Sequence, residues 1–108
     1  MAVLKNCFHL VANITSESTD VTLLILQRAN VIQVMTSISE NSDCDGTMLK
    51  NIVWLASLLM QQRSSLGLTR DNKLKLCEIG KGGLMAIDSS IASDACWLFA
   101  YALDTEDD

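Results

Sequence analysis

Residues 49–59 read LKNIVWLASLL, and the chain repeats this pattern on both sides of them. Residues 4–14 read LKNCFHLVANI and open with the same Leu-Lys-Asn triplet. Residues 93–103, SDACWLFAYAL, align with both segments when Ser93 stands under Lys5 and Lys50, so that His9, Trp54 and Trp97 share one column of the alignment. These three residues stand 45 and 43 residues apart. The sequence therefore contains an internal repeat.

A period of about 40–47 residues is typical of armadillo and HEAT repeats, which contain two or three helices each. Between the aligned segments, residues 21–29 and 31–38 carry apolar side chains at helical spacing. The β-branched residues of 31–38 leave a strand there as the alternative. We expect an all-α fold, an armadillo-type α-solenoid with three helices per repeat. In this fold, residues 47–62 stack between residues 3–15 and residues 93–105.

The repeats divide the single domain, residues 1–108, into unequal parts. Residues 3–15 form the third helix of one repeat, residues 19–62 and 69–105 form two full repeats, and residues 104–108 form an acidic tail. Solenoids usually need at least three repeats for stability, because each repeat buries its apolar face against its neighbours. The chain is therefore either a piece of a larger array or a unit that packs against a partner. We expect self-association through the uncapped end at residues 3–15.

Capping residues and glycines predict where the helices begin and end. The pair Thr19-Asp20 is expected to start the helix over 21–29, Asp45 or Thr47 to cap the helix over 47–62, and Ser93 or Asp94 to cap the last helix. Residues 64–67 are expected to form a loop. The glycines at positions 80, 82 and 83 are expected to end a helix over 70–79 and to separate it from a short helix over 83–90.

Composition excludes several classes of function. The 108 residues include eight Lys and Arg against thirteen Asp and Glu, a formal charge of −5, which disfavours binding to nucleic acid. No apolar run approaches the length of a membrane span. The four cysteines lack the CxxC spacing of zinc and redox sites and are expected to be reduced. With His9 as the only histidine, we expect no enzyme activity, no metal and no cofactor.

The third-helix segments resemble those of the importin-α family of armadillo proteins. Residues 94–104, DACWLFAYALD, are similar to the family's Asp-x-Cys-Trp-Ala-x-Ser-Tyr-Leu-x-Asp helix, and residues 49–54 resemble its Leu-basic-Asn-x-x-Trp opening. Residues 61–68 occupy the place of an irregular linker. Residues 26–32, LQRANVI, resemble its Val-x-x-Ala-Gly-Ala-Ile junction, with Asn30 at the glycine position.

The resemblance implies an adaptor of nuclear import, present in cytoplasm and nucleus, whose third helices bind basic nuclear localisation peptides in an extended form. Indole rings attract lysine by cation–π contact, and asparagine amides bind the peptide backbone. The peptide-binding positions fall on Trp54, Trp97, Asn13, Tyr101 and His9. His9 stands where the family has tryptophan, and Leu58 where it has asparagine. Acidic residues Asp94, Asp104 and Glu106 form the implied rim that selects basic side chains.

Other interpretations stay open at this point. Trp54 and Trp97 have the helical spacing of core residues, and the residues at 104–108 have the composition of a solvated tail. The alternative function is that of a structural or docking subunit, in which degenerate repeats bind a larger assembly and no peptide.

Overall fold

The computed structural model describes residues 2–41 and 44–104, which form seven helices and, in these ranges, no strand. The prediction of an all-α fold is confirmed, and the segment with the strand alternative is helical. The helices are α1 (Ala2–Glu17), α2 (Thr19–Arg28), α3 (Val31–Ser39), α4 (Gly46–Gln61), α5 (Arg63–Leu66), α6 (Arg70–Leu84) and α7 (Ser89–Ala102).

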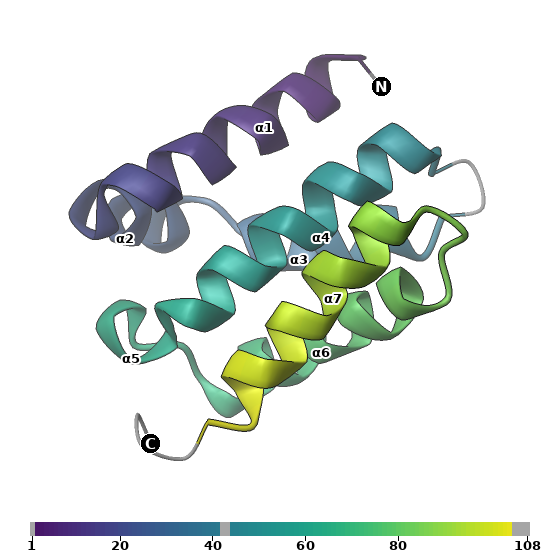
Figure 1. Ribbon diagram of the computed structural model, residues 1–108. Coiled ribbons are helices and arrows are strands. Elements are labelled where there is room, and N and C mark those ends of the chain that lie inside the picture. The colour runs from purple at the N-terminus through teal and green to yellow at the C-terminus, as the bar shows by residue number, and fades with distance from the viewer. Residues whose placement is uncertain (1, 42–43, 105–108) are drawn as a thin grey trace.

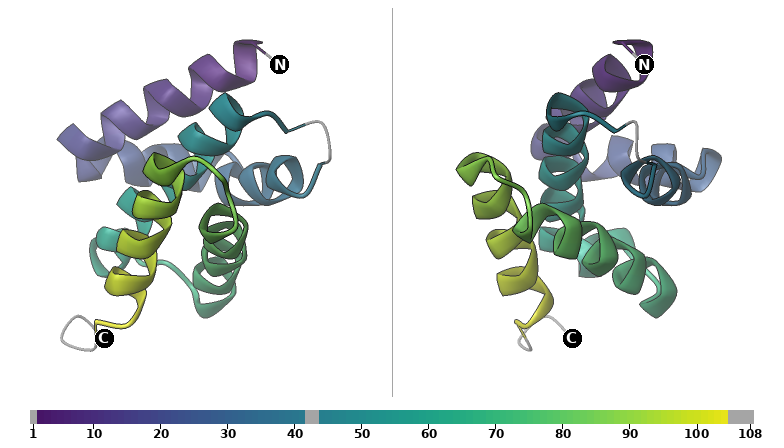
Figure 2. Two further views of the ribbon diagram at one scale, coloured as in Figure 1. Left: turned by 45° about the vertical axis from the view of Figure 1, so that its right-hand side comes forward. Right: turned by 90° about the vertical axis from the view of Figure 1, so that its right-hand side faces the viewer.

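The central element is α4, which packs against α1 on one side and against α7 and α6 on the other. In Figure 1, α1, α4 and α7 run side by side in the same direction, with α3 and α6 behind them. The right-hand view of Figure 2 shows α4 between α1 above it and α7 and α6 below. Contacts also join α2 to α5 and α3 to α6. Each helix from α1 to α4 therefore touches the helix three places later in the chain.

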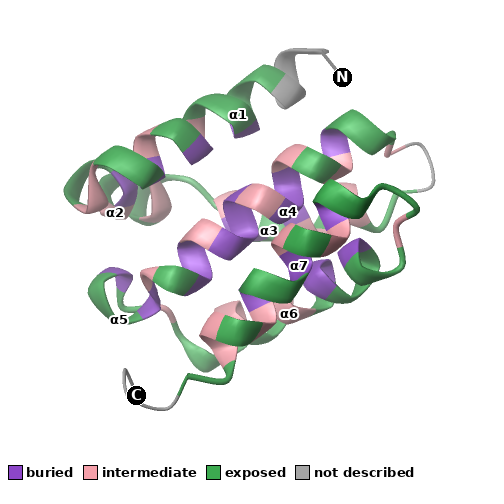
Figure 3. Ribbon diagram, viewed as in Figure 1, coloured by how far each residue is buried: buried purple, intermediate pink, exposed green. Residues whose placement is uncertain are grey.

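The core is built around α4, which has buried side chains on most of its circumference. Its eight buried residues are Met48, Ile52, Val53, Leu55, Ala56, Ser57, Leu59 and Met60. Figure 3 shows buried positions along the whole of α4, whereas α1 and α7 bury only the side that faces it. Burial on most sides of α4 follows from its position between α1 and the pair α6 and α7.

The aligned apolar positions are not equally buried in the three segments. Leu55 and Leu98 are fully buried, whereas Leu10, in the same column, is 59% exposed. Cys96 is exposed, unlike Phe8 and Val53 in its column. Leu103, one residue beyond the column of Leu59, follows the end of α7 and is 79% exposed, whereas Leu59 is buried. Leu10 and Cys96 lie on α1 and α7, the outer helices of this row, on sides that face solvent.

Of three predicted helix caps, the cap of α4 is confirmed and those of α2 and the last helix differ. Asp45, one of the two predicted alternatives, caps α4. Its Oδ1 accepts a hydrogen bond from the Met48 N–H at 2.8 Å. The cap of α2 is Ser18 rather than the Thr19-Asp20 pair. The last helix begins a turn earlier than predicted, at Ser89, because Asp88 accepts a hydrogen bond from the Ser90 N–H at 2.8 Å. Ser93 and Asp94 therefore lie inside α7.

The predicted break at the glycines is wrong, and so is the predicted loop before it. Helix α6 continues through all three glycines to Leu84, while the short helix of this part of the chain is α5, a single turn at residues 63–66. A β-carbon on Gly83 would lie 3.0 Å from Val53 Cγ2 and 3.1 Å from Ala95 Cβ, and one on Gly80 would lie 3.0 Å from Phe99. These two glycines allow close contact between helices, which outweighs their low helix propensity.

Gln62 joins the end of α1 to the start of α2 by two hydrogen bonds. Its Nε2 donates to the Thr15 carbonyl at 2.8 Å, and its Oε1 accepts from the Thr19 hydroxyl at 2.8 Å. The carbonyls of the last turn of a helix have no partner inside that helix, so the Gln62 amide satisfies one of them. Nearby, the buried Thr22 hydroxyl donates to the Thr15 hydroxyl at 3.2 Å.

Replacing Gln62 by alanine should lower the free energy of unfolding by about 1–2 kcal/mol, because two hydrogen bonds are lost at a half-buried site. Urea unfolding followed by circular dichroism measures the loss. The adjacent Gln61 is exposed and serves as the control, since Gln61→Ala should change stability by less than about 0.5 kcal/mol. Equal losses in the two variants would contradict the assigned role.

Among the described residues, no single helix is long and apolar enough to cross a membrane. Taken together, α2 and α3 have the length and apolar composition of a membrane span, but the two helices are bent by 76° at their junction.

Candidate functional site

The face built by α1, α4 and α7 carries the residues aligned by the repeat. Because these helices run in the same direction, equivalent positions lie next to each other (Figure 1). We call this surface the tryptophan face and define it by His9, Asn13, Trp54, Trp97 and Tyr101.

The first aromatic pair joins α1 to α4. The His9 and Trp54 ring centroids are 5.7 Å apart and their planes are tilted by 50°. Trp54 is half-buried and His9 is exposed, so one side of the indole packs on the histidine and the core while part of it faces solvent. The repeat column therefore corresponds to a contact in space.

The second aromatic pair lies on α7. Trp97 and Tyr101 are four residues apart, their ring centroids are 5.8 Å apart, and the rings are stacked at 28°. Residues at this spacing share one face of a helix. Trp97 is 57% exposed, so it is not a core residue, and Tyr101 is half-buried beneath it. The pair offers an open aromatic surface to solvent.

An interaction between Lys50 and Asp94 links α4, which carries Trp54, to α7, which carries Trp97. The two side chains interact electrostatically across the α4–α7 contact: burial raises the pKa of Asp94, and the Lys50 ammonium partly opposes this rise. Lys50 is one turn before Trp54, and Asp94 is one turn before Trp97. Since α4 and α7 run in the same direction, each tryptophan follows this interaction by about one turn on its own helix.

The next turn of the tryptophan face is less polar than the resemblance implies. Asn13 is exposed on α1, one turn beyond His9. The equivalent residue on α4 is Leu58, which is half-buried and packs against the core. Neither tryptophan is followed by an asparagine one turn later, and Asn13 follows His9.

The acidic rim is divided between two ends of the face. Asp94 is partly buried near Lys50, whereas Asp104 follows the end of α7 and is exposed. The Asp104 carbonyl accepts a hydrogen bond at 2.6 Å from Nη2 of Arg63, a nearly fully buried residue that also donates to the Met60 carbonyl. Glu106 and the rest of the tail after Asp104 lie outside the described residues.

Two of the cysteine thiols, Cys44 and Cys77, are half-buried. In residues 2–41 and 44–104, no group of three His, Cys, Asp or Glu side chains lies close enough to hold a metal ion. Burial raises the pKa of the Cys44 thiol, and the Asp45 charge raises it further. Cys77 is affected in the same way by burial and by Glu78. Both thiols therefore stay protonated at neutral pH, which makes them poor nucleophiles.

Two residues near the tryptophan face, Lys50 and Arg63, were not singled out from the sequence. Lys50 had a usable signal, since it stands one turn before Trp54 in the Leu-Lys-Asn triplet. Arg63 had none, because it falls in a segment that was expected to be a linker.

Comparisons with protein-family models, with curated protein sequences and with solved structures found no match for this chain.

Proposed function

We propose that this chain is a protein-binding module whose tryptophan face binds extended, basic peptides. The observation that carries the proposal is that two packed helices that run in the same direction, α4 and α7, each carry a tryptophan, Trp54 and Trp97, beside a second ring. An indole face attracts lysine or arginine and packs against the apolar stem of its side chain.

The contact pattern of the helices supports an armadillo-type arrangement in this proposal. The first, second and third helices of one expected repeat are α2, α3 and α4, and they touch α5, α6 and α7, respectively. Such like-with-like contacts are what a stack of repeats requires, and they produce an extended surface along the third helices.

The distance between the two indoles determines how far apart the basic residues of the peptide should stand. Packed helices lie about 8–10 Å apart, and an extended peptide advances about 3.3 Å per residue. Trp54 and Trp97 would therefore flank basic side chains two to four residues apart. The net charge of −5 favours such a ligand, whereas the Lys50 ammonium, near the site, disfavours it.

A second candidate function is that of a docking subunit that binds no peptide. It is favoured by Leu58, which is apolar at the position where an asparagine amide would bind the peptide backbone. If the chain does bind peptides, the missing interaction makes binding weak. We expect a Kd of tens of micromolar or poorer, which is a binding free energy of roughly 6 kcal/mol.

Calorimetric titration with a Lys-Lys-x-Lys peptide tests the proposal. Binding should weaken as salt is added, because salt screens the attraction between charges. Trp97→Ala should weaken binding at least about tenfold, since the exposed indole is lost. Lys50→Gln should strengthen it about twofold, because a like charge is removed at low cost.

Two controls make this result specific. Leu74→Ala removes an exposed apolar side chain from α6, away from the tryptophan face, and should leave binding unchanged. A Glu-Glu-x-Glu peptide should not bind. No heat with millimolar basic peptide, while circular dichroism shows a folded protein, would overturn the peptide-binding proposal and favour the docking subunit.

A further inference from the structure

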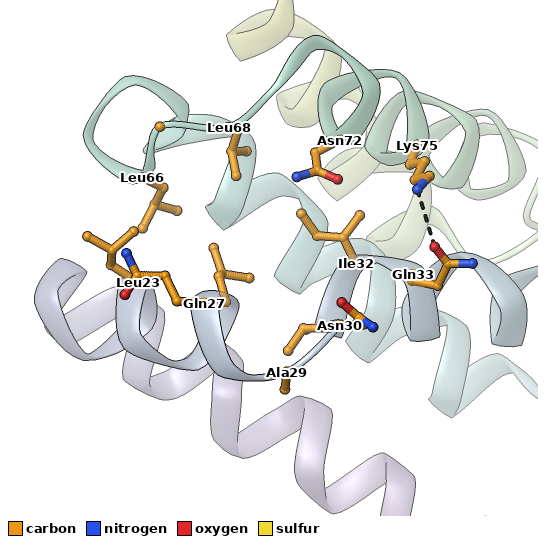
Figure 4. A pocket seen from close by; sticks show the side chains of 13 residues that line it. Leu23, Gln27, Ala29, Asn30, Ile32, Gln33, Leu66, Leu68, Asn72 and Lys75 are labelled. Carbon is orange, nitrogen blue, oxygen red and sulfur yellow. Dashed lines mark hydrogen bonds between the residues drawn. The ribbon is translucent and has the colours of Figure 1, made fainter.

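Helix α2 carries apolar side chains on two opposite faces, of which the inner one joins it to the rest of the molecule. On the inner face Thr22 is buried, and Leu23 and Leu26 pack against the core. Figure 4 shows part of this face, with Leu23 beside Leu66 of α5. The contacts of α2 with α1, α3 and α5 leave the opposite side of the helix open.

The outer face of α2 is apolar, although it is open to solvent. Val21 and Leu24 are exposed, and Ile25 is half-buried beside them. Together with Arg28 and Ala29 they line a shallow depression whose surface is almost entirely apolar. The spacing of residues 21, 24, 25 and 28 is that of one side of a helix. Single apolar residues on a surface need no partner, but a contiguous group of them marks an interaction site.

Two opposite charges flank the centre of this outer face at equal distances. Asp20 stands four residues before Leu24, and Arg28 stands four residues after it, so that all three share one side of the helix. Both charged residues are exposed, and within residues 2–41 and 44–104 neither forms an ion pair. Four residues of α-helix span about 6 Å. A second copy of this face, turned end for end about Leu24, therefore brings each charge to its opposite.

We propose that two copies of this chain associate through the outer faces of their α2 helices, which run antiparallel about a twofold axis near Leu24. The apolar residues of one copy pack against the same residues of the other, and Asp20 of each copy lies beside Arg28 of the other. Such an interface is self-complementary, so each of these charge pairs occurs twice. Each copy contributes one side of a ten-residue helix, and so small a contact gives a weak dimer. The proposal does not depend on the tryptophan face, which lies on α1, α4 and α7.

Sedimentation velocity over a range of concentrations up to millimolar protein measures the dimer. Leu24→Asp should weaken association at least about tenfold, because a charge enters the centre of the interface in both copies. Leu74→Asp is the matched control, since Leu74 lies on α6 and is 54% exposed, against 51% for Leu24. It should leave association unchanged. Circular dichroism checks that both variants are folded.

Reversing the two charges tests the antiparallel arrangement. Asp20→Arg and Arg28→Asp should each weaken association about fivefold, because like charges then meet across the interface. The chain with both substitutions should associate as the unaltered chain does. Within one helix, however, the double reversal places a base in the first turn and an acid in the last, and both oppose the helix dipole. An effect on the fold alone would therefore make the double variant the worst of the three, whereas the proposal predicts recovery.

Variants on other exposed surfaces locate the contact. Leu10→Asp lies in the segment 3–15, where self-association was expected from the sequence, and it should leave the α2 dimer intact. Trp97→Ala should leave it intact as well. The proposal is overturned if the chain stays a monomer at millimolar concentration, which would leave the outer face to a different protein. It is also overturned if Leu24→Asp associates as the unaltered chain does, if Leu10→Asp abolishes association, or if the double reversal fails to restore it.

Discussion

Replacing Leu55 by alanine should lower the free energy of unfolding by about 2–5 kcal/mol. Leu55 is fully buried in α4, the helix that packs against α1, α6 and α7, so the lost side chain leaves a cavity where three contacts meet. The surrounding helices are held by their own contacts and can close such a cavity only in part. Urea unfolding followed by far-ultraviolet circular dichroism measures the change.

The repeat provides a matched control for this prediction. Leu10 occupies the same column of the alignment but is 59% exposed on the edge helix α1. Leu10→Ala should change the free energy of unfolding by less than about 0.5 kcal/mol. If the two substitutions cost the same, the central position of α4 would be wrong.

Adding one methyl group at Gly83 should lower the free energy of unfolding by about 1–3 kcal/mol. The new β-carbon would lie 3.0 Å from Val53 Cγ2 and 3.1 Å from Ala95 Cβ. Val53 is fully buried and the Ala95 Cβ is attached directly to the α7 backbone, so neither can move without shifting a helix. The cost of this strain exceeds the gain in helix propensity.

The neighbouring Gly82 isolates that strain. It lies in the same helix, is exposed, and has no atom within 4 Å of the position that a β-carbon would take. Gly82→Ala should raise stability by about 0.5–1 kcal/mol, because alanine restricts the unfolded chain and favours helix. Thermal unfolding of both variants gives the comparison, and a stabilised Gly83→Ala protein would contradict the close α6–α7 contact.

The candidate site was predictable in part. The alignment column that contains His9 and Trp54 corresponds to a ring contact across two helices, because a repeated segment presents the same face in each copy. The stacking of Tyr101 on Trp97 also follows from spacing within one helix. The proximity of Lys50 to Asp94 required the register between α4 and α7, which a pattern within one helix does not contain.

The sequence by itself determined that the chain is helical, because apolar spacing is a property of the chain alone. It also determined that residues 4–14, 49–59 and 93–103 repeat one pattern. Only the tertiary structure decided which aligned residues are buried, since Leu10 and Leu55 differ in the number of neighbouring helices and not in local pattern. It also decided that α6 passes through Gly80 and Gly83, where contact with α4 and α7 outweighs the local preference to break. Local propensities amount to about 1 kcal/mol per residue, so packing between helices overrides them wherever the two conflict.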